Sequence, residues 1–479
     1  MIHAKAFGPV SRSAIQTRFA SSKQTRTVDQ PAPTVTLATY AHKWRNQEHA
    51  SRIESRPLPA IRVWRRVRGG RMNPHLVCVG GEDHALRIPF LMSLREKGFR
   101  VTAVSSGSEA AFLRHGIPHR QYGFDRFSSG TGQWATVKTI RKLMSELRPD
   151  VVQSFDTKPN LLTPLAARGK FPVIRTINGL GWTFSSLEPR ALALRPIFCG
   201  LQGLVSFWTA ATVFQNRDDQ AFFERYRLIR RGSGGLIRGS GIDVDAFAMA
   251  RHLAPPAMKM REDLGLDQSA EVIVFVGRLT RQKGIPTLLK AIPRILSKRP
   301  NARVVLVGPW ESEGPFAVDK AEIDRYAPNV IALGPRRDVP ALLGMADMFA
   351  FPTEYREGIP RVLLEAGLAG LPIVASRMPG CNDVVQDGWN GYLVPPHDAD
   401  GLASRIIDVL SDRERGKLMG SRSVELVREQ FSLPWVVDQY SDLYKNVLSA
   451  KSHGDLARPV SPILLEKDAA EPEMGGVRR

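Results

Sequence analysis

The feature that most constrains the fold is a repeated order of short apolar run, glycine turn and helical spacing. His75–Val79 is such a run; Gly80-Gly81 then turns the chain, and Ile88–Lys97 has helical spacing before a second run at Phe99–Val104. Strands that alternate with helices predict a parallel, doubly wound α/β sheet. The turn at Gly80-Gly81 is not G-x-G-x-x-G, so a dinucleotide site is not favoured.

The same order recurs further along the chain. Val272–Val276 is apolar, Gly277 ends it, and Gly284 precedes the next helical segment. Arg278 and Lys283 are therefore expected in a loop at the carboxyl edge of a parallel sheet, where open α/β folds bind ligands. The alternative is that both are ordinary solvated surface residues.

Two carboxylates follow the next apolar run, Met348–Pro352. Glu357 precedes a Gly-Ile-Pro turn, and we expect Glu365 about two turns into the helix that Arg361 opens. A helix N-terminus between two carboxylates suits a sugar nucleotide, because N–H groups face phosphates and carboxylates accept hydrogen bonds from hydroxyls. A solvated pair on an amphipathic helix is the alternative.

The ordered motifs resemble one known family. They are Gly-Arg-Leu-x(4)-Gly, Glu-x(7)-Glu, Gly-Leu-Pro-Ile-Val-Ala at 370–375 and Asp-Gly-Trp-Asn-Gly-Tyr-Leu-Val at 387–394. Over roughly 73–448 the chain resembles the retaining GT-B glycosyltransferases of family 4. This resemblance implies two doubly wound, Rossmann-like domains that face a cleft.

The resemblance also implies roles for particular residues. Arg278 and Lys283 would bind the donor diphosphate, Glu357 the transferred sugar and Glu365 the ribose; Arg278, Lys283 and Glu357 are the candidate catalytic residues. The candidate substrate-binding residues are Gly80, Gly81, His84, Lys158, Asn178, Gly358, Ile359, Pro360, Arg361 and Glu365. For His84 the alternative is a surface histidine of a loop.

Two further strand ends depart from the family pattern. Many family 4 enzymes carry histidines there, whereas this chain has Gln153, Phe155 and Asn178. Thr-Lys-Pro-Asn at 157–160 together with the segment from Asn178 resembles a bacterial subgroup that glycosylates polyprenyl-diphosphate-linked sugars. Lys158 would then meet an acceptor diphosphate, or else be a plain surface lysine.

A front-face retaining mechanism does not need a protein base. The departing diphosphate oxygen takes the acceptor proton, and the main task is to stabilise the charge of the leaving group. Arg278 and Lys283 can do this as charge-assisted donors. We therefore expect no metal site and no cofactor beyond the nucleotide-sugar co-substrate.

Composition and charge narrow the class of protein. The three cysteines, Cys78, Cys199 and Cys381, form no C-x-x-C pair, which argues against a disulfide framework or a zinc site and favours a reducing cytosol. Of the net charge of +20, residues 1–71 contribute +11. No aromatic-plus-basic recognition module is visible, so nucleic acid is not the expected partner.

The first 71 residues are Arg- and Ser-rich and contain no long apolar run. Their start mimics a mitochondrial presequence, but we prefer a disordered basic extension. The segment 190–214 is a poor spanning helix, because Arg195, Pro196 and Gln202 interrupt it. It could dock on an inner membrane leaflet with the arginines of 225–231, or form an amphipathic core helix followed by a strand.

The expected boundaries are a 1–71 extension, a 72–240 acceptor-binding domain, a 241–431 nucleotide-sugar-binding domain, a 432–448 helix returning to the first domain, and a disordered 449–479 tail. The expected function is a retaining, metal-independent transferase at the cytoplasmic face of the plasma membrane. It would move a hexose or N-acetylhexosamine from a UDP-sugar to a lipid-linked saccharide in exopolysaccharide, capsule or O-antigen synthesis. The alternatives are a transferase with a soluble acceptor, similar to sucrose or starch synthase, and a non-catalytic basic membrane-binding scaffold.

Overall fold

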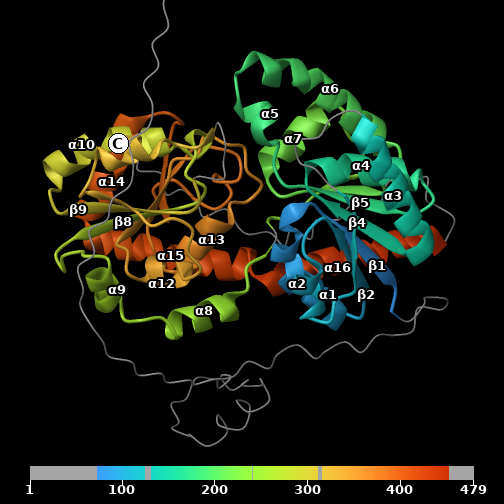
Figure 1. Cartoon of the computed structure of the whole chain (residues 1–479), viewed down its shortest axis with the longest axis horizontal. Helices are drawn as coiled ribbons and strands as arrows, with labels where there is room; N and C mark the ends of the chain where they lie inside the picture. The colour runs from blue at the N-terminus through green and yellow to red at the C-terminus, as the bar shows by residue number, and fades with distance from the viewer. Residues whose placement is uncertain (1–72, 124–130, 240, 311–315, 453–479) are drawn as a thin grey trace, which may run out of the picture. The chain divides into compact units, whose positions relative to one another are not determined.

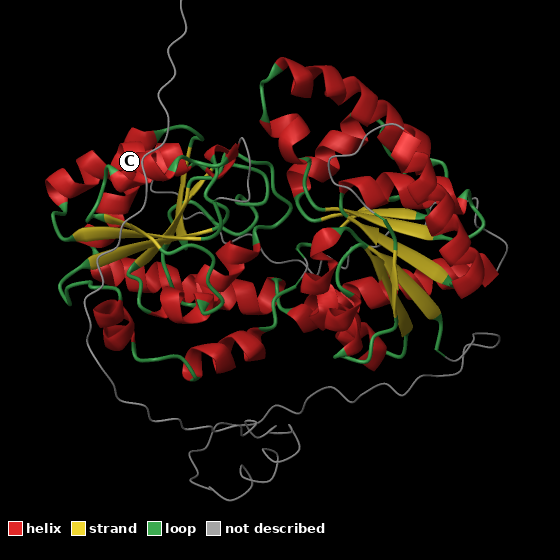
Figure 2. Ribbon diagram, viewed as in Figure 1, coloured by secondary structure: helices red, strands yellow, loops and turns green. Residues whose placement is uncertain are grey.

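The computed structural model describes residues 73–123, 131–239, 241–310 and 316–452, which form two α/β domains with helices on both faces of each sheet (Figures 1 and 2). The first sheet has the strand order β3-β2-β1-β4-β5-β6-β7, and the second has the order β10-β9-β8-β11-β12-β13. All neighbouring strands are parallel. The doubly wound α/β architecture predicted from the sequence is confirmed.

The elements of the first domain are β1 (His75–Val79), the 3-10 helix η2 (Glu82–Arg87), α1 (Ile88–Glu96), β2 (Arg100–Ser105), α2 (Glu109–Leu113), β3 (His119–Gln121), α3 (Thr131–Leu147), β4 (Val151–Phe155), α4 (Thr157–Ala167), β5 (Val173–Ile177), α5 (Gly181–Ser185), α6 (Pro189–Ser206), β6 (Ala211–Phe214), α7 (Arg217–Arg225) and β7 (Gly234–Leu236). The elements of the second domain are α8 (Val244–His252), α9 (Ala257–Asp263), β8 (Glu271–Val276), the 3-10 helix η3 (Arg281–Lys283), α10 (Ile285–Lys298), β9 (Ala302–Val307), α11 (Lys320–Asp324), β10 (Val330–Ala332), α12 (Val339–Gly344), β11 (Met348–Phe351), α13 (Arg361–Leu368), β12 (Ile373–Ser376), β13 (Gly391–Val394), α14 (Ala399–Ser411) and α15 (Arg413–Gln430). The last helix, α16, spans Leu433–Ser452.

Strand β1 shows why a fully apolar run makes a central strand. Leu76 and Cys78 face one side of the first sheet and pack in the cluster that includes α1 and α16. Val77 and Val79 face the other side and pack with residues of α3 and α4. Because successive side chains alternate between faces, a strand covered on both sides needs apolar residues throughout.

Helix α16 follows the second domain in sequence but buries its apolar face against the first sheet. Val436, Tyr440 and Tyr444 are buried there, in the cluster that also holds β1 and β2 residues. The helix runs to Ser452, so 449–452 are helical and not part of a disordered tail. The predicted extension at 1–71 and the rest of that tail, 453–479, lie outside the described residues.

The segment between the two domains runs beside the start of α16. The Ile242 N–H donates to the Phe431 carbonyl oxygen at 2.9 Å, and the Leu433 N–H donates to the Ile242 oxygen at 2.8 Å. The chain thus leaves the first domain and returns to it along paired backbone segments.

The segment 190–214 forms helix α6 followed by strand β6. This is the helix-then-strand order of the second alternative, and one face of the helix is buried, with Ala191, Gln202, Val205 and Ser206. Large apolar side chains stay exposed on and beside α6: Leu187, Leu192, Leu194, Ile197, Leu201, Leu204 and Phe207.

Candidate active site

The candidate donor residues lie at the carboxyl ends of two neighbouring strands of the second sheet. Strand β8 leads into Arg278, and strand β11 leads into the loop that carries Glu357. The two strands are paired side by side, so their following loops meet at one edge. This is the edge at which parallel α/β sheets bind ligands.

Lys283 and Glu357 form an ion pair across these loops. Both side chains are largely buried, with exposed fractions of 11% and 18%. The Lys283 ammonium also lies 5.5 Å from the ring centres of Phe351 and Tyr355. Burial against aromatic rings strengthens the field of this ammonium, because little water screens it.

Gly284 lets this loop approach β11 closely. Its φ is +74°, and a Cβ at this position would lie 1.7 Å from the Pro352 carbonyl oxygen. Only glycine fits such a contact in the left-handed region. The glycine predicted to precede α10 therefore also brings Lys283 toward the Glu357 loop.

Helix α13 begins at this edge, after Gly358, Ile359 and Pro360. No side chain caps its N-terminus, so the first-turn N–H groups have no side-chain acceptor. Such a terminus favours an anion. The helix begins at Arg361, as the sequence predicted, and its contact with phosphate stays a prediction.

Glu365 lies one turn into α13, not two, and this corrects the expected position. Its Oε1 accepts a hydrogen bond from Arg361 Nε, four residues earlier, at 3.0 Å. Burial raises the pKa of Glu365, and the Arg361 guanidinium opposes the shift only in part. A largely buried carboxylate of this kind suits hydroxyl donors.

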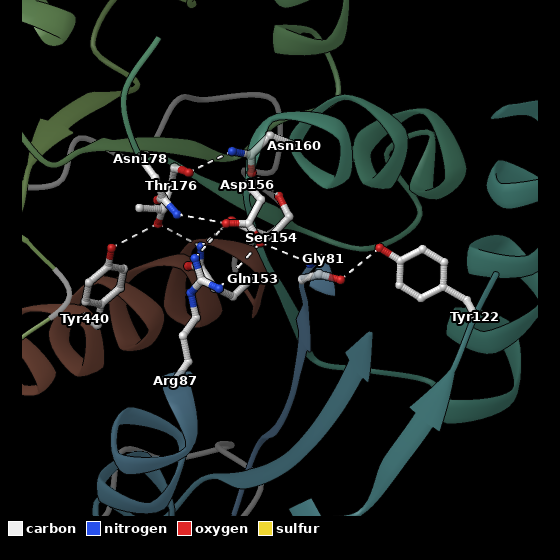
Figure 3. Close-up of polar contacts among 11 residues, drawn as sticks. Gly81, Arg87, Tyr122, Gln153, Ser154, Asp156, Asn160, Thr176, Asn178 and Tyr440 are labelled. Carbon is white, nitrogen blue, oxygen red and sulfur yellow. Dashed lines mark hydrogen bonds and ion pairs between the residues drawn. The ribbon is translucent and has the colours of Figure 1, made fainter. Parts of the chain in front are cut away.

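In the first domain, Asp156 is the centre of the polar contacts at the strand ends (Figure 3). It follows β4 and accepts hydrogen bonds from the Gly81 N–H at 3.0 Å, from Arg87 at 2.7 Å and from Asn178 Nδ2 at 3.1 Å. The glycine turn after β1 is thus tied to the ends of β4 and β5. Sequence reasoning gave Asp156 and Arg87 no role, although the position of Asp156 after an apolar run was a usable signal.

The backbone and charge of Asp156 are both unusual. Its φ of +70° and ψ of 156° are strained for a residue with a side chain. Burial raises its pKa, but Arg87, the Gly81 N–H and His84 lower it by more, so the net pKa lies below the usual value. Asp156 is therefore an ionised acceptor at neutral pH.

This carboxylate also orients Asn178. Because Asp156 accepts only, the Asn178 amide nitrogen must face it and the amide oxygen must point away. That buried Oδ1 has no hydrogen-bond partner among the described residues. Asn178 therefore has an acceptor atom available to a ligand.

His84 lies inside the core and not on the surface, as the alternative had it. It is fully buried between Phe112 and Phe155, with ring centres 5.7 and 6.2 Å away. A Cβ at Gly80 would lie 2.1 Å from His84 Nδ1, so the glycine leaves room for the ring. Burial, followed by Arg87, lowers the pKa of His84 to about 3. The imidazole packs against the Gly80-Gly81 turn. A contact between His84 and substrate stays a prediction.

Beneath Asp156, buried hydrogen bonds join α16 to the strands (Figure 3). Tyr440 and Thr176 share a hydrogen bond of 2.9 Å, and Tyr444 donates to Gln153 Oε1 at 3.0 Å. Gln153 Nε2 also donates to Thr176. Gln153 is thus committed to the core and is not placed to replace a catalytic histidine.

A small cavity is lined by residues of the first domain, of α16 and of α13. Its volume is about 30 Å³, and its lining includes Arg87 and Phe155 of the first domain, Tyr440 of α16 and Arg361 of α13. Arg87, which binds Asp156, and Arg361, the first residue of α13, therefore border the same space. Lys158, on α4, is half-buried, and its proposed contact with an acceptor stays a prediction.

Comparison with known protein families finds two matches along this chain. Residues 76–199 match the glycosyl transferase 4-like family, and residues 270–412 match the glycosyl transferases group 1 family. Each match covers the main part of one of the two domains.

Individual curated proteins are similar to this chain at low sequence identity. Spore coat protein SA of Bacillus subtilis is 30% identical over 39% of this chain and 52% of its own length. The UDP-Gal:alpha-D-GlcNAc-diphosphoundecaprenol alpha-1,3-galactosyltransferase of Escherichia coli is 25% identical over 65% of this chain and 79% of its own. The chain spans about half the length of the first curated relatives it matches.

Among solved structures, Anabaena HepE in complex with UDP-glucose has a TM-score of 0.65, at 19% identity over 79% of this chain and 100% of that one. Identity this low shows a shared fold. The chain thus has the two-domain GT-B fold, and a segment of each domain matches a glycosyltransferase family model.

Proposed function

We propose that this protein is a retaining, metal-independent glycosyltransferase that uses a UDP-sugar. One observation carries the proposal: the buried Lys283–Glu357 pair lies at the strand-end edge beside the uncapped N-terminus of α13, with Glu365 one turn into that helix. A cation, a helix N-terminus without a side-chain cap and two carboxylates are groups that suit a nucleotide sugar. Support for UDP comes from the likeness to HepE, which was solved with UDP-glucose.

The donor diphosphate would replace Glu357 as the ion-pair partner of Lys283. Lys283 pairs with Glu357 in the protein alone; a bound diphosphate would compete for the ammonium and leave Glu357 to accept a sugar hydroxyl. Arg278, in the same loop region, would add a second cation. Two cations can stabilise the departing diphosphate as a metal ion would, so we propose that no metal is required.

The transfer step would need no protein base. The bond between the anomeric carbon and the diphosphate oxygen breaks, the acceptor oxygen bonds to the same face of that carbon, and the acceptor proton moves to the departing oxygen. Asp156 is a poor candidate for a base, because its lowered pKa leaves it weakly basic at neutral pH. Its proposed role is to orient Asn178, whose Oδ1 would accept a hydrogen bond from the acceptor.

We propose a lipid-linked saccharide as the acceptor. The Escherichia coli relative is named for a diphosphoundecaprenol-linked acceptor. On this chain, Ile197, Leu201 and Leu204 are exposed along one face of α6, and Phe207 follows with 71% of its surface exposed. The arginines at 225, 227, 230 and 231 lie further along the same domain.

An interfacial helix of this kind would hold the enzyme on the anionic inner face of the plasma membrane. No described helix is both long and apolar enough to cross a bilayer. The proposed association is therefore peripheral, and the proposed setting is exopolysaccharide, capsule or O-antigen assembly.

A thermal-shift screen tests the donor. UDP-glucose, UDP-galactose, UDP-N-acetylglucosamine and GDP-mannose are compared, each with EDTA present. A donor at about 100 times its dissociation constant should stabilise the fold by roughly 2.7 kcal/mol. Incubation of that donor with a synthetic polyprenyl-diphosphate sugar should then yield a product with the anomeric configuration of the donor. Binding of no nucleotide sugar, or inversion at the anomeric carbon, would contradict the proposal.

Vesicle sedimentation tests whether the exposed face of α6 binds membranes. The chain should bind phosphatidylglycerol vesicles better than phosphatidylcholine vesicles, and Ile197→Gln with Leu201→Gln should weaken this binding. Leu418→Gln is the matched control, because Leu418 is similarly exposed but lies on α15. Equal vesicle binding by the α6 variant and the control would rule out this docking face.

A further inference from the structure

The loop that carries Glu357 belongs to the second domain but is held by the first. Asn216, which follows β6, donates from Nδ2 to the carbonyl oxygens of Glu357 at 3.0 Å and Gly358 at 3.3 Å. The Glu357 side chain meanwhile pairs with Lys283 in its own domain. We propose that Asn216 and Asp219 are positioning residues, which hold the sugar-binding loop in its active shape from across the domain boundary.

Asn216 is suited to this task because both ends of its amide have assigned partners. Its Oδ1 accepts the Asp219 N–H at 2.8 Å and so caps the N-terminus of α7. The Nδ2 group donates to the two loop carbonyls and also to Asp219 Oδ2 at 3.0 Å, so one amide joins the loop to the start of α7. The residue is completely buried, so these hydrogen bonds are not weakened by water.

An ion pair ties the same loop to α7. Arg356, next to Glu357, binds Asp219 Oδ1 at 2.9 Å, and the Asp219 side chain is completely buried. Burial raises the pKa of Asp219, and its contacts with Arg356 and Asn216 work against that shift. A buried carboxylate is costly without a cation, so separation of Arg356 from Asp219 would be strongly unfavourable.

The backbones meet so closely that only glycine fits. A Cβ on Gly179 would lie 2.6 Å from the Arg356 carbonyl oxygen, and a Cβ on Gly358 would lie 3.0 Å from the Asn178 carbonyl carbon. The Arg356 N–H donates to Ser185 Oγ at 2.8 Å. The loops after β5 and β6 therefore both hold the loop around Arg356 and Glu357.

This arrangement separates two steps of the proposed reaction, and the inference rests on that proposed function. The groups assigned to the nucleotide, Arg278, Lys283 and Glu365, all lie in the second domain. The contacts described above reach the loop assigned to the sugar and none of these three groups. Loss of these contacts should leave nucleotide binding intact and slow the transfer step.

Asn216→Ser is the most direct test. Serine keeps a side-chain oxygen to cap α7 but has no amide group for the loop carbonyls. Asp218→Asn is the matched control, since Asp218 also reaches the second domain, through an exposed 3.5 Å contact with Asn382. We expect Asn216→Ser to lower kcat by about 10-fold or more, because small displacements of catalytic groups have large effects, with the UDP dissociation constant within about 2-fold of wild type. The control should match wild type in both.

Hydrogen exchange of the peptide that spans 355–360 gives a second measurement without ligand. Exchange should rise in Asn216→Ser and stay unchanged in Asp218→Asn. If Asn216→Ser does not fold, Arg356→Lys and Arg356→Gln replace it, and lysine should restore part of the activity that glutamine loses.

The outcomes separate the two proposals. Failure of wild-type protein to bind any nucleotide sugar would refute the proposed function, whereas the exchange comparison would still test the loop contact. Unchanged kcat together with unchanged exchange in Asn216→Ser would overturn the positioning role. An equal loss of UDP binding and turnover would also overturn it, because it would show a general defect of the second domain.

Discussion

The two domains use their charged residues in different ways. In the second domain, Lys283 and Glu357 pair with each other at the strand-end edge, and the N-terminus of α13 has no side-chain cap. In the first domain, Asp156 accepts hydrogen bonds from Gly81, Arg87 and Asn178. The second domain, which we propose binds the donor, therefore has groups that a ligand can recruit. In the first domain, the proposed acceptor side, the Asp156 carboxylate already holds loops in place. Substitutions should accordingly affect catalysis more than stability in the second domain, and both together in the first.

The largest effect should come from the donor cations. Lys283→Ala or Arg278→Ala should remove about 2–4 kcal/mol of transition-state stabilisation, measured as kcat/KM, with little change in thermal stability. Arg281→Ala is the matched control, because Arg281 lies in the same loop but is 57% exposed and pairs with Glu322. Unchanged turnover in both the Lys283→Ala and Arg278→Ala variants would contradict the proposed catalytic role of these two residues.

Asp156→Asn should produce the mixed effect expected of the first domain. The substitution keeps the shape of the side chain but leaves Arg87 without its carboxylate, so we expect a loss of about 1–3 kcal/mol in the free energy of unfolding at pH 7, together with lower turnover. Urea titration and kinetics on the same preparation measure both. A variant with normal stability and reduced turnover would show that Asp156 acts on the ligand directly.

The pH dependence of the Asp156 contribution has a defined sign. The folded pKa is lowered, so the carboxylate stabilises the fold fully above its unfolded pKa of about 3.9 and loses this contribution as pH falls through the folded pKa. The stability gap between wild type and Asp156→Asn should therefore be constant from pH 7 to 5 and narrow at pH 3. A gap that grows toward acid would show that the folded pKa is raised.

Substitutions where α16 packs on the first sheet should cause smaller losses of unfolding free energy. Tyr444→Phe leaves Gln153 Oε1 without its donor and should cost about 1–2 kcal/mol of unfolding free energy. Tyr440→Phe should cost less, because Thr176 keeps its hydrogen bond from Gln153. Denaturant titration of the two variants compares them, and a larger loss in Tyr440→Phe would contradict this order.

The smallest effect should come from removal of residues 1–71. They are Arg-, Ser- and Pro-rich and have no apolar periodicity to pack on a core. A chain that starts at Met72 should fold and keep full activity. Insolubility or inactivity of the shortened chain, beside active full-length protein, would show that the segment is needed.

The positions of the proposed donor residues could be predicted because their signals are local in sequence. Val272–Val276, Gly277 and Gly284 mark a strand, its end and a helix start within a few residues, and Arg278 and Lys283 lie between them. The strand-end rule for parallel sheets then places both side chains without knowledge of distant contacts. The same holds for Glu357 and for the helix that Arg361 opens.

The hydrogen bonds around Asp156, and the contacts of Asn216 and Asp219 with the second domain, could not be predicted from local sequence signals. Asp156 gains its role from partners 75 and 69 positions away, and its positive φ leaves no mark in the sequence. Asn216 and Asp219 meet their partners across 141 and 137 positions. His84 is buried because Gly80 has no side chain in the way, and a loop-like pattern cannot reveal such a fit.

Calorimetric titration of UDP tests the central claim most directly, namely that Glu365 binds the ribose and Glu357 the transferred sugar. Glu365→Ala should weaken UDP by about 10-fold or more, since a hydrogen bond to a charged group contributes roughly 1.5–3 kcal/mol. Glu357→Ala should bind UDP as wild type does and mainly lower turnover, because its partner hydroxyl is absent from UDP. Equal losses of UDP affinity in the two variants, or a larger loss in Glu357→Ala, would contradict the account.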